Sequence, residues 1–280
     1  MLTSYSIPPH PVLNDFIHNY TVCKSGCDNI NMTFPLYANH ETSLGFFLGD
    51  TAIKIKNHNI INETKSSKVF LFGLSTSYKG TMTSQGNYHT FTIEFKPNGF
   101  NKLFGIPASK ICNSTFPANE VIGNAAGHFY EQLLHASGIQ EMTLFADIFL
   151  IGFLNRQKAM YIHNGITRIS NLLLTTLNTN ISQYASQANM SMRNFERRFV
   201  EQVGTSPKLF CRLLRFNAAM KFKMSDPKKG MSEIAYECGY YDSMHMIKEF
   251  KQFSNASPTA LFNENPGILN GGCYKVFPTL

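Results

Sequence analysis

A short pattern of small, turn-forming and helix-capping residues occurs twice in the last hundred residues of this chain. In the first copy, Ala185 is followed four residues later by Asn189 and then by Ser191. A small residue such as Ala185 lets two helices approach closely, and Asn189 tolerates the left-handed backbone of a tight turn. Ser191 can cap the next helix, in which Phe195 and Phe199 share one face. This pattern predicts a helix-turn-helix.

The second copy repeats the layout with different side chains. Ala235 is followed four residues later by Gly239, and Asp242 stands where it can cap the next helix. Met246 and Phe250 repeat the four-residue apolar spacing. We therefore expect a second helix-turn-helix.

Each copy ends in the dipeptide Ser-Pro, at Ser206-Pro207 and at Ser257-Pro258, 51 residues apart. Serine caps a helix and proline suits its first position. Gly204 and Asn255 precede these dipeptides, and both tolerate the left-handed backbone that ends many helices. Both units are therefore bounded by helix signals.

Between the units, the apolar spacing predicts one long helix from Pro207 to about Met224. Its apolar face carries Leu209, Leu213, Phe216 and Met220, and its polar side carries Arg212 and Arg215. A rigid helix would set the distance between two recognition helices, near residues 191–203 and 242–253. Successive major grooves on one face of DNA are about 34 Å apart. We expect the chain to read two such grooves.

The candidate DNA-contacting residues lie on the polar faces of the two recognition helices: Arg193, Asn194, Glu196, Arg197, Ser243, Met244, His245 and Lys248. Arginine can contact guanine with two hydrogen bonds, glutamate can accept from cytosine, and Met244 suits a thymine methyl group. Other readings remain open. The arginines could be solvated, Glu196 could pair along its own helix, His245 could pack under its helix, and Lys248 could neutralise a phosphate.

Net charge points to a polyanionic partner. The formal charge is +7, with a pI near 9.0. Residues 166–264 hold thirteen lysines and arginines against eight aspartates and glutamates. Most of the excess positive charge therefore lies in the region with the two units.

The N-terminal part reads as strands. Short apolar runs at Ser43–Leu48, Val69–Leu74 and Tyr88–Phe95 are separated by turn-forming residues. In the last run apolar and polar residues alternate, which predicts a half-buried strand in a small sandwich or barrel. Apolar spacing then predicts helices at 124–136 and 141–157.

Residues 166–264 resemble the DNA-binding domain of the AraC family of bacterial transcription regulators. The resemblance is most specific at Ile234-Ala235, Gly239-Tyr240, Phe250-Lys251 and Ser257-Pro258. Asn189 and Asn255 replace the family's usual glycines, and Lys248 stands where arginine is common. The N-terminal region resembles a cupin-like sensor domain. The residues that carry this resemblance are His10-Pro11, Phe34-Pro35, Phe47-Leu48-Gly49-Asp50, Phe95-Lys96-Pro97 and Leu103-Phe104-Gly105-Ile106-Pro107.

These resemblances imply an α+β chain with a cupin-like sensor or dimerisation domain at 1–160. A double helix-turn-helix domain follows at 166–264, and a flexible tail at 265–280. The function implied is a sequence-specific transcription regulator, an activator controlled by a small-molecule effector. Its partners would be double-stranded operator DNA, RNA polymerase, the unknown effector and a second copy joined through the 141–157 helix.

We expect no enzymatic activity, cofactor or metal. The six cysteines show no disulfide framework, and neither a signal peptide nor a membrane span is evident, so we expect a cytoplasmic protein. Two other classes remain open. One is a cupin-like metal-dependent isomerase or dioxygenase with an appended helical domain, although His40, Glu41, His58 and His89 lack the tight spacing of such a site. The other is an architectural DNA-binding protein without sequence preference.

Overall fold

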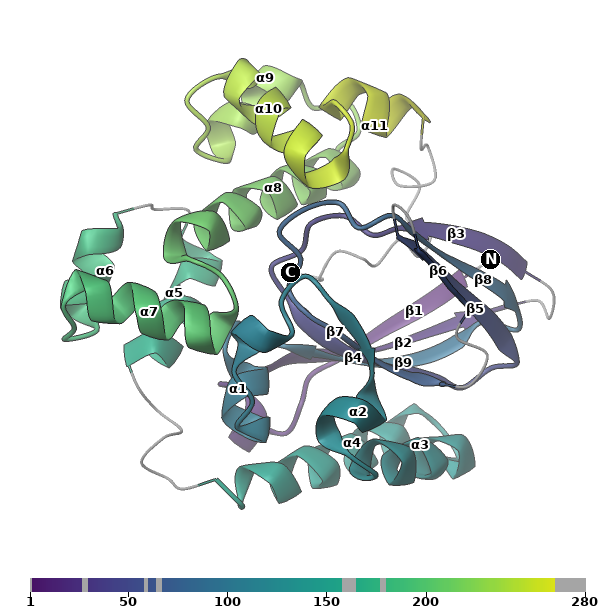
Figure 1. Cartoon of the computed structure of the whole chain (residues 1–280). Helices are drawn as coiled ribbons and strands as arrows, with labels where there is room; N and C mark the ends of the chain where they lie inside the picture. Colours follow the sequence, from purple (N-terminus) through teal and green to yellow (C-terminus); the bar gives the residue numbers. More distant parts are fainter. Residues whose placement is uncertain are drawn as a thin grey trace.

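The computed structural model describes residues 2–26, 30–57, 60–63, 67–157, 165–176 and 180–264. Figure 1 shows an N-terminal region (residues 2–157) rich in strands and a C-terminal region (residues 165–264) made of helices. The α+β fold class expected from the sequence is confirmed. Most of the interval between the two predicted domains, 161–165, and the whole predicted tail at 265–280 lie outside the described residues. No described helix is long and apolar enough to cross a membrane.

Two antiparallel sheets form the N-terminal region. The strands are β1 (Leu2–Ile7), β2 (Ile17–Ser25), β3 (Ile30–Pro35), β4 (Thr42–Phe47), β5 (Thr51–Asn57), β6 (Ile60–Glu63), β7 (Val69–Phe72), β8 (Thr81–Gly86), β9 (His89–Phe95) and β10 (Thr115–Pro117). One sheet has the order β1-β2-β9-β4-β7-β10, and the other β3-β8-β5-β6. Phe34 of the second sheet packs with Phe47 and Phe70 of the first, so the two sheets make a sandwich.

Strand β9 lies in the middle of the larger sheet, between β2 and β4. Phe91, Ile93 and Phe95 are fully buried, as their alternation predicted. Thr90 and Glu94 point to the opposite face and are only 4% and 6% exposed. The prediction of a half-buried strand was therefore wrong, because the second sheet and the C-terminal region cover the other face as well.

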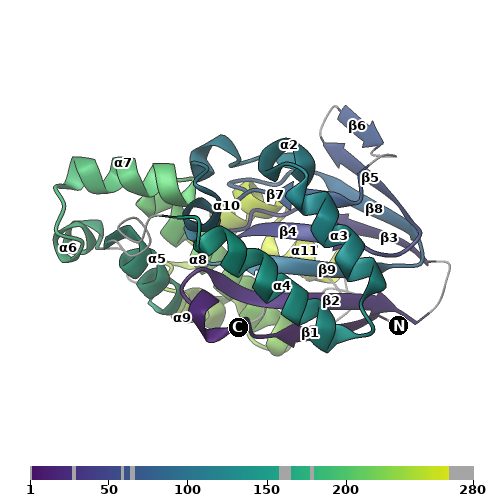
Figure 2. The same ribbon diagram turned by 90° about the horizontal axis from the view of Figure 1, so that it is seen from below.

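Helices cover the outer face of the larger sheet, as Figure 2 shows for α3 and α4. Two short turns, η1 (Pro11–Leu13) and η2 (Ala108–Lys110), accompany α1 (Gly99–Phe104), α2 (Ala118–Ile122), α3 (Ala125–His135) and α4 (Ile139–Leu154). Phe129 of α3 stacks on Phe149 of α4 and meets Phe46 of β4 edge-on. Helices α3 and α4 match the two expected from apolar spacing. The sequence reading missed α1, which is only six residues long.

The C-terminal region consists of α5 (Gly165–Thr175), α6 (Ile181–Gln187), α7 (Met192–Val203), α8 (Pro207–Ser225), α9 (Met231–Glu237), α10 (Ser243–Ser254) and α11 (Pro258–Glu264). The apolar spacing of the sequence is explained by one core. Phe195 and Phe199 of α7 and Phe250 of α10 are at most 1% exposed and belong to the same cluster as Phe210 and Phe216 of α8.

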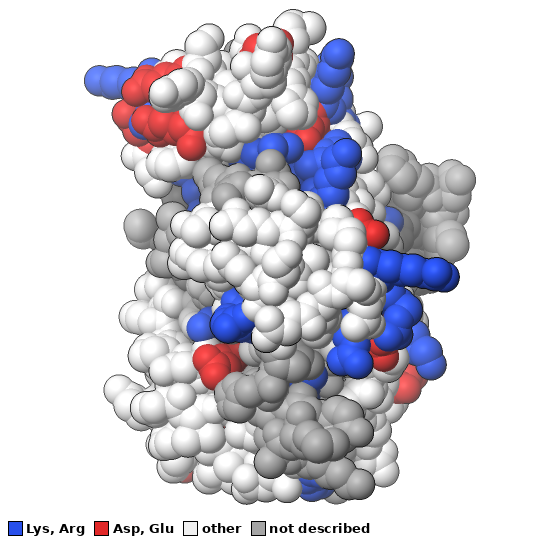
Figure 3. Space-filling view, turned by 90° about the vertical axis from the view of Figure 1, so that its left-hand side faces the viewer, with Lys and Arg blue, Asp and Glu red and all other residues white. Residues whose placement is uncertain are grey.

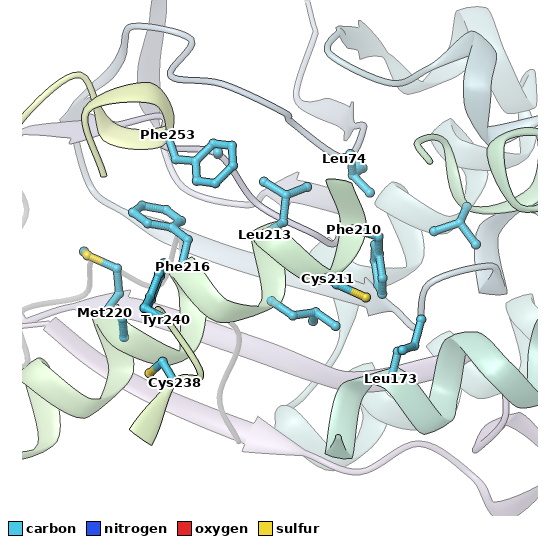
Figure 4. Close-up of a cluster of buried hydrophobic side chains, with 14 of the residues drawn as sticks. Leu74, Leu173, Phe210, Cys211, Leu213, Phe216, Met220, Cys238, Tyr240 and Phe253 are labelled. Carbon is cyan, nitrogen blue, oxygen red and sulfur yellow. The ribbon is translucent and has the colours of Figure 1, made fainter. Parts of the chain in front are cut away.

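This core is shared with the N-terminal region. Tyr37, Ala38 and Leu74 come from loops next to the strands, yet they are buried in the C-terminal cluster. Figure 4 shows Leu74 beside Leu213 and Phe210 of α8. Part of the contact between the two regions is therefore apolar and continuous with the core of the helices.

Candidate DNA-binding interface

The first helix-turn-helix consists of α6 and α7. Asn189, in the turn, has a φ of 54°, so the left-handed backbone expected there is present. Ser191 caps α7, since its hydroxyl accepts a hydrogen bond from the backbone N–H of Asn194 at 3.4 Å. Gly204 ends the helix with a φ of 103°. The local geometry follows the residue pattern that predicted it.

The second unit consists of α9 and α10. Gly239 has a φ of 71°, and Asn255 ends α10 with a φ of 63°. The Asp242 carboxylate caps α10, accepting a hydrogen bond from the backbone N–H of His245 at 2.6 Å. We call α7 and α10 the first and second reader helices, because each follows the turn of its unit.

Helix α8 joins the two units without interruption. It begins at Pro207 behind the capping hydroxyl of Ser206 and contains 19 residues. At 1.5 Å per residue its length is about 28 Å. Its buried side chains contact both reader helices, since Phe210 meets Phe199 and Phe216 meets Phe250. The two readers are therefore held on one rigid element.

On the first reader helix, Arg193, Glu196 and Arg197 are exposed, and Asn194 is half-buried. Nη2 of Arg197 donates to the Asn194 side-chain oxygen at 3.1 Å, and its Nη1 lies 3.6 Å from the Glu201 carboxylate. With 65% of its side chain exposed, Arg197 can leave these weak contacts for a partner. All four predicted residues lie in the first half of the helix.

The second reader helix presents a different surface. Met244 is 58% exposed and Lys248 is exposed, whereas Ser243 is half-buried. His245 is turned towards its own domain, with Nε2 3.4 Å from the buried carboxylate of Glu249 and its ring edge-on to Tyr240. Of the four residues predicted here, Met244 and Lys248 are the most accessible.

Sequence reasoning missed the role of Glu249, which is only 2% exposed. Nε of Arg212 lies 2.7 Å from its Oε1, and Nη2 of Arg215 lies 3.3 Å from the same atom. These arginines were expected on the polar side of α8, but they link α8 to α10. Glu249 interrupts the apolar stripe of Met246, Phe250 and Phe253, and this interruption was the available signal. Burial, and then the Glu249 carboxylate, raise the pKa of Tyr240 next to this group.

Two tyrosines at the second unit were also missed. Tyr236 is 85% exposed and Tyr241 is 93% exposed, and Tyr241 directly precedes the capping Asp242. A contiguous exposed apolar patch often marks an interaction site, whereas single exposed apolar side chains are common on protein surfaces. Tyr241 and Met244 add exposed apolar surface at the start of the second reader helix, and Tyr236 adds it on α9.

Figure 3 shows how charged side chains are distributed over one face of the molecule. Lysines and arginines gather along one edge of that face over much of its height. Acidic side chains gather mainly at the opposite upper corner. A basic edge of this kind is the electrostatic feature expected for phosphate contact.

The metal candidates that the structure describes do not form a metal site. Nε2 of His40 lies 3.7 Å from Oε1 of Glu41, but both are buried where the two regions meet. His89 is at the start of β9, and His58 lies outside the described residues. Among the described residues, no group of three or more His, Cys, Asp and Glu side chains could hold a metal ion.

Two helix-turn-helix units on one connecting helix, with basic residues on an exposed reader helix, define a DNA-binding domain. Comparison with known families agrees. Residues 184–264 match a family described as a helix-turn-helix domain, and residues 5–117 match a domain of unknown function (DUF6597). The C-terminal region is an AraC-type helix-turn-helix domain, as its resemblance predicted.

Relatives among known proteins match mainly this domain. An uncharacterized HTH-type transcriptional regulator of Haemophilus influenzae is 35% identical over 79 residues, which cover 28% of this chain and 26% of the relative. The HTH-type transcriptional activator RhaS of Escherichia coli is 29% identical over 114 residues, 39% of this chain and 40% of RhaS. The chain thus spans less than half the length of these relatives.

Two solved structures are also similar. ToxT from Vibrio cholerae aligns over 97% of this chain and 98% of its own, with 12% identity and a TM-score of 0.48. The DNA-binding domain of AdpA, solved in complex with a target DNA, aligns over 38% of this chain and 96% of its own, with 21% identity and a TM-score of 0.35.

Proposed function

We propose that this protein is a sequence-specific transcription regulator that reads two successive major grooves of one operator with α7 and α10. The observation that carries this proposal is the rigid connection of two complete helix-turn-helix units through α8. Each unit leaves the start of its reader helix accessible, and this is the part of the motif that enters the groove. The match to a helix-turn-helix family and the regulators among the relatives support the same function.

In this proposal the first reader helix contributes the charged contacts. Arg193 and Arg197 bind guanine or nearby phosphates, Glu196 accepts a hydrogen bond from cytosine, and Asn194 orients Arg197. At the second reader helix, Lys248 contacts a base and Met244 contacts a thymine methyl group. Ser243 and His245 lie beside them at the edge of the contact.

We assign the N-terminal region to effector sensing. Polar side chains lie between its two sheets, where an apolar core alone would need none. The Thr21 hydroxyl donates to Glu94 Oε1 at 3.0 Å, and the Ser84 hydroxyl is fully buried without a hydrogen-bond partner. Such groups fit a small polar effector. A regulator of this kind would act in the cytosol and contact RNA polymerase if it activates.

The same region supplies a surface for a second copy. Leu144 and Ile148 lie four residues apart on α4 and are 55% and 60% exposed, and Leu134 of α3 is 42% exposed. An apolar stripe of this spacing is typical of helix pairing. We propose that α4 joins two copies of the chain, which would place four reader helices on a paired operator.

The test is selection of bound duplexes from a randomised pool by the full-length protein, followed by competition binding. We expect one enriched site with two conserved blocks about 10–10.5 base pairs apart, centre to centre. Lengthening the DNA between the two blocks by half a helical turn should abolish the additional binding affinity that the second block provides. Equal affinity for the selected site and unrelated duplexes would instead indicate an architectural DNA-binding protein.

A further inference from the structure

Residues Tyr37–Glu41, which we call the crossover segment, connect the two sheets of the sandwich. They follow β3, in the four-stranded sheet, and lead into β4, in the six-stranded sheet. Asn39 is anchored to Ser75 by two backbone hydrogen bonds of 2.9 Å. Because the segment spans both sheets, its position depends on their spacing.

The segment also touches the end of the second reader helix. Tyr37 and Ala38 are 5% and 0% exposed and are part of the C-terminal core. The backbone N–H of Ala38 donates to the carbonyl oxygen of Phe253, at 2.9 Å, in the last turn of α10. A shift of Ala38 therefore acts directly on α10.

The next residues of the segment contact α8 through Asn217, which is 1% exposed. Nδ2 of Asn217 lies 3.3 Å from the Asn39 side-chain oxygen and 3.1 Å from Nδ1 of His40. The His40 ring also meets Phe210 of α8 edge-on, at 6.0 Å between centroids. Polar and aromatic contacts together hold the segment against the helix that carries both readers.

The segment ends in a buried group of charges that reaches into the sandwich. Glu41 and Glu94 are 7% and 6% exposed, and Lys221 stands one turn beyond Asn217 on α8. Burial raises the pKa of Glu41, Glu94 raises it further, and Lys221 opposes this rise. Glu94 accepts from Thr21, which points to the same face as Cys23 between the sheets. Polar groups thus extend from the sandwich interior to α8.

We propose that the crossover segment couples the interior of the sandwich to the second DNA reader. A change in sheet spacing moves residues 37–41, and this displacement passes through Asn217 to α8 and through Ala38 to the end of α10. This inference rests on the proposed function and specifies how DNA reading is regulated. It identifies Asn217 as a positioning residue for DNA binding, although it lies in the contact between regions.

A double-mutant cycle tests this coupling without knowledge of the effector. Thr21→Val keeps the shape of the side chain and removes the hydroxyl that donates to Glu94, away from both reader helices. We expect Thr21→Val to change affinity for the selected operator about fivefold or more, the lower range of measured coupling between sites. In an Asn217→Ala background, the same substitution should change affinity by a clearly smaller factor, because only the route through Ala38 and Phe253 remains.

A matched control loosens the contact between the regions elsewhere. Nδ2 of Asn98 donates to Oγ1 of Thr167 in α5 at 2.9 Å, a buried hydrogen bond that does not involve the crossover segment. In an Asn98→Ala background the effect of Thr21→Val should persist. If Asn217→Ala does not fold, His40→Phe replaces it, because phenylalanine keeps a ring against Phe210 and removes the Nδ1 acceptor.

Three results overturn the coupling: no effect of Thr21→Val on operator affinity, an equal effect with and without Asn217, or an effect lost equally in Asn98→Ala. Each leaves the proposed function intact, provided that the unmodified protein still prefers its selected operator. Failure of the unmodified protein to prefer any duplex would contradict the proposed function itself. The two failures are therefore distinguishable.

Discussion

Nε of Arg212 in α8 lies 2.7 Å from Oε1 of Glu249 in α10, a carboxylate that is 2% exposed. Arg215 reaches the same oxygen from one turn further along α8, at 3.3 Å. The second reader helix is thus tied to the connecting helix by a buried ion pair as well as by its core. This pairing and the packing of Phe216 against Phe250 together hold α10 against α8.

The first prediction follows from this ion pair. Glu249→Ala leaves two arginines without their shared buried partner, and removing one member of such a group costs about 3–5 kcal/mol. We expect the free energy of unfolding, measured in urea, to fall by that order. Glu201→Ala is the control, because Glu201 pairs with Arg197 in solvent and should cost at most about 1 kcal/mol. Equal losses of unfolding free energy in the two variants would show that the buried ion pair stabilises the protein no more than the exposed one.

The second prediction concerns Arg197. A bidentate contact between arginine and guanine is worth about 1–3 kcal/mol, so Arg197→Ala should weaken operator binding roughly 5- to 150-fold and relax preference at one or two base pairs. Binding to a library of single-base variants measures both effects. Arg156→Ala removes the same charge in the turn just after α4. It should leave the operator affinity within about twofold. Unchanged affinity of Arg197→Ala would remove Arg197 from the site.

The third prediction separates base reading from phosphate contact at Lys248. We expect Lys248→Ala to weaken binding to the selected operator while leaving random duplexes almost unaffected. A phosphate contact would instead weaken both similarly and reduce the salt slope by about one. Titrations of both duplexes across a salt series provide the measurement. Similar losses on the two duplexes would refute base reading by Lys248.

The fourth prediction concerns the apolar stripe of α4. A charge within a helix pair prevents close packing, so Ile148→Glu should convert a dimer into a monomer. Sedimentation of the full-length protein at micromolar concentration measures this change. Leu172→Glu is a matched control, since Leu172 is also an exposed aliphatic residue, at 38%, but lies on α5. A strictly monomeric unmodified protein would exclude the α4 interface.

The fifth prediction is a pH dependence at His40. Burial, then Lys221 and His18, lower the pKa of His40 to about 3. The folded protein therefore binds this proton less readily than the unfolded chain, and stability should fall as the pH drops below about 6.5. The largest slope is about 1.4 kcal/mol per pH unit. The contribution of Glu41 to this pH dependence has the opposite sign. Because its pKa is raised in the folded protein, its contribution to stability falls as the pH rises above about 4.5.

Comparison with His40→Gln isolates the histidine contribution from that of Glu41. Unfolding free energies at pH 7 and pH 5 should show a larger acid-induced loss for the unmodified protein than for His40→Gln. The same loss in both proteins would show that His40 accepts a proton in the folded state.

The sequence alone determined the local structure of both helix-turn-helix units. Asn189 and Gly239 adopt the left-handed backbone, and Ser191 and Asp242 cap the helices they precede. These features depend on atoms within about four residues of one another, so residue type and spacing are sufficient to predict them. The eight proposed contact residues came from the same local pattern and stay a prediction until DNA binding is measured.

Only the tertiary structure decided which polar residues face solvent and which are buried. Glu94 looked like the outer residue of an alternating strand, and Arg212 like a solvated residue of a helix, yet both meet partners from other elements. Asn217 contacts His40 across 177 residues of sequence. Local spacing cannot predict such contacts, because they exist only once the sandwich and the helices have packed together, and burial then requires each polar group to find a partner.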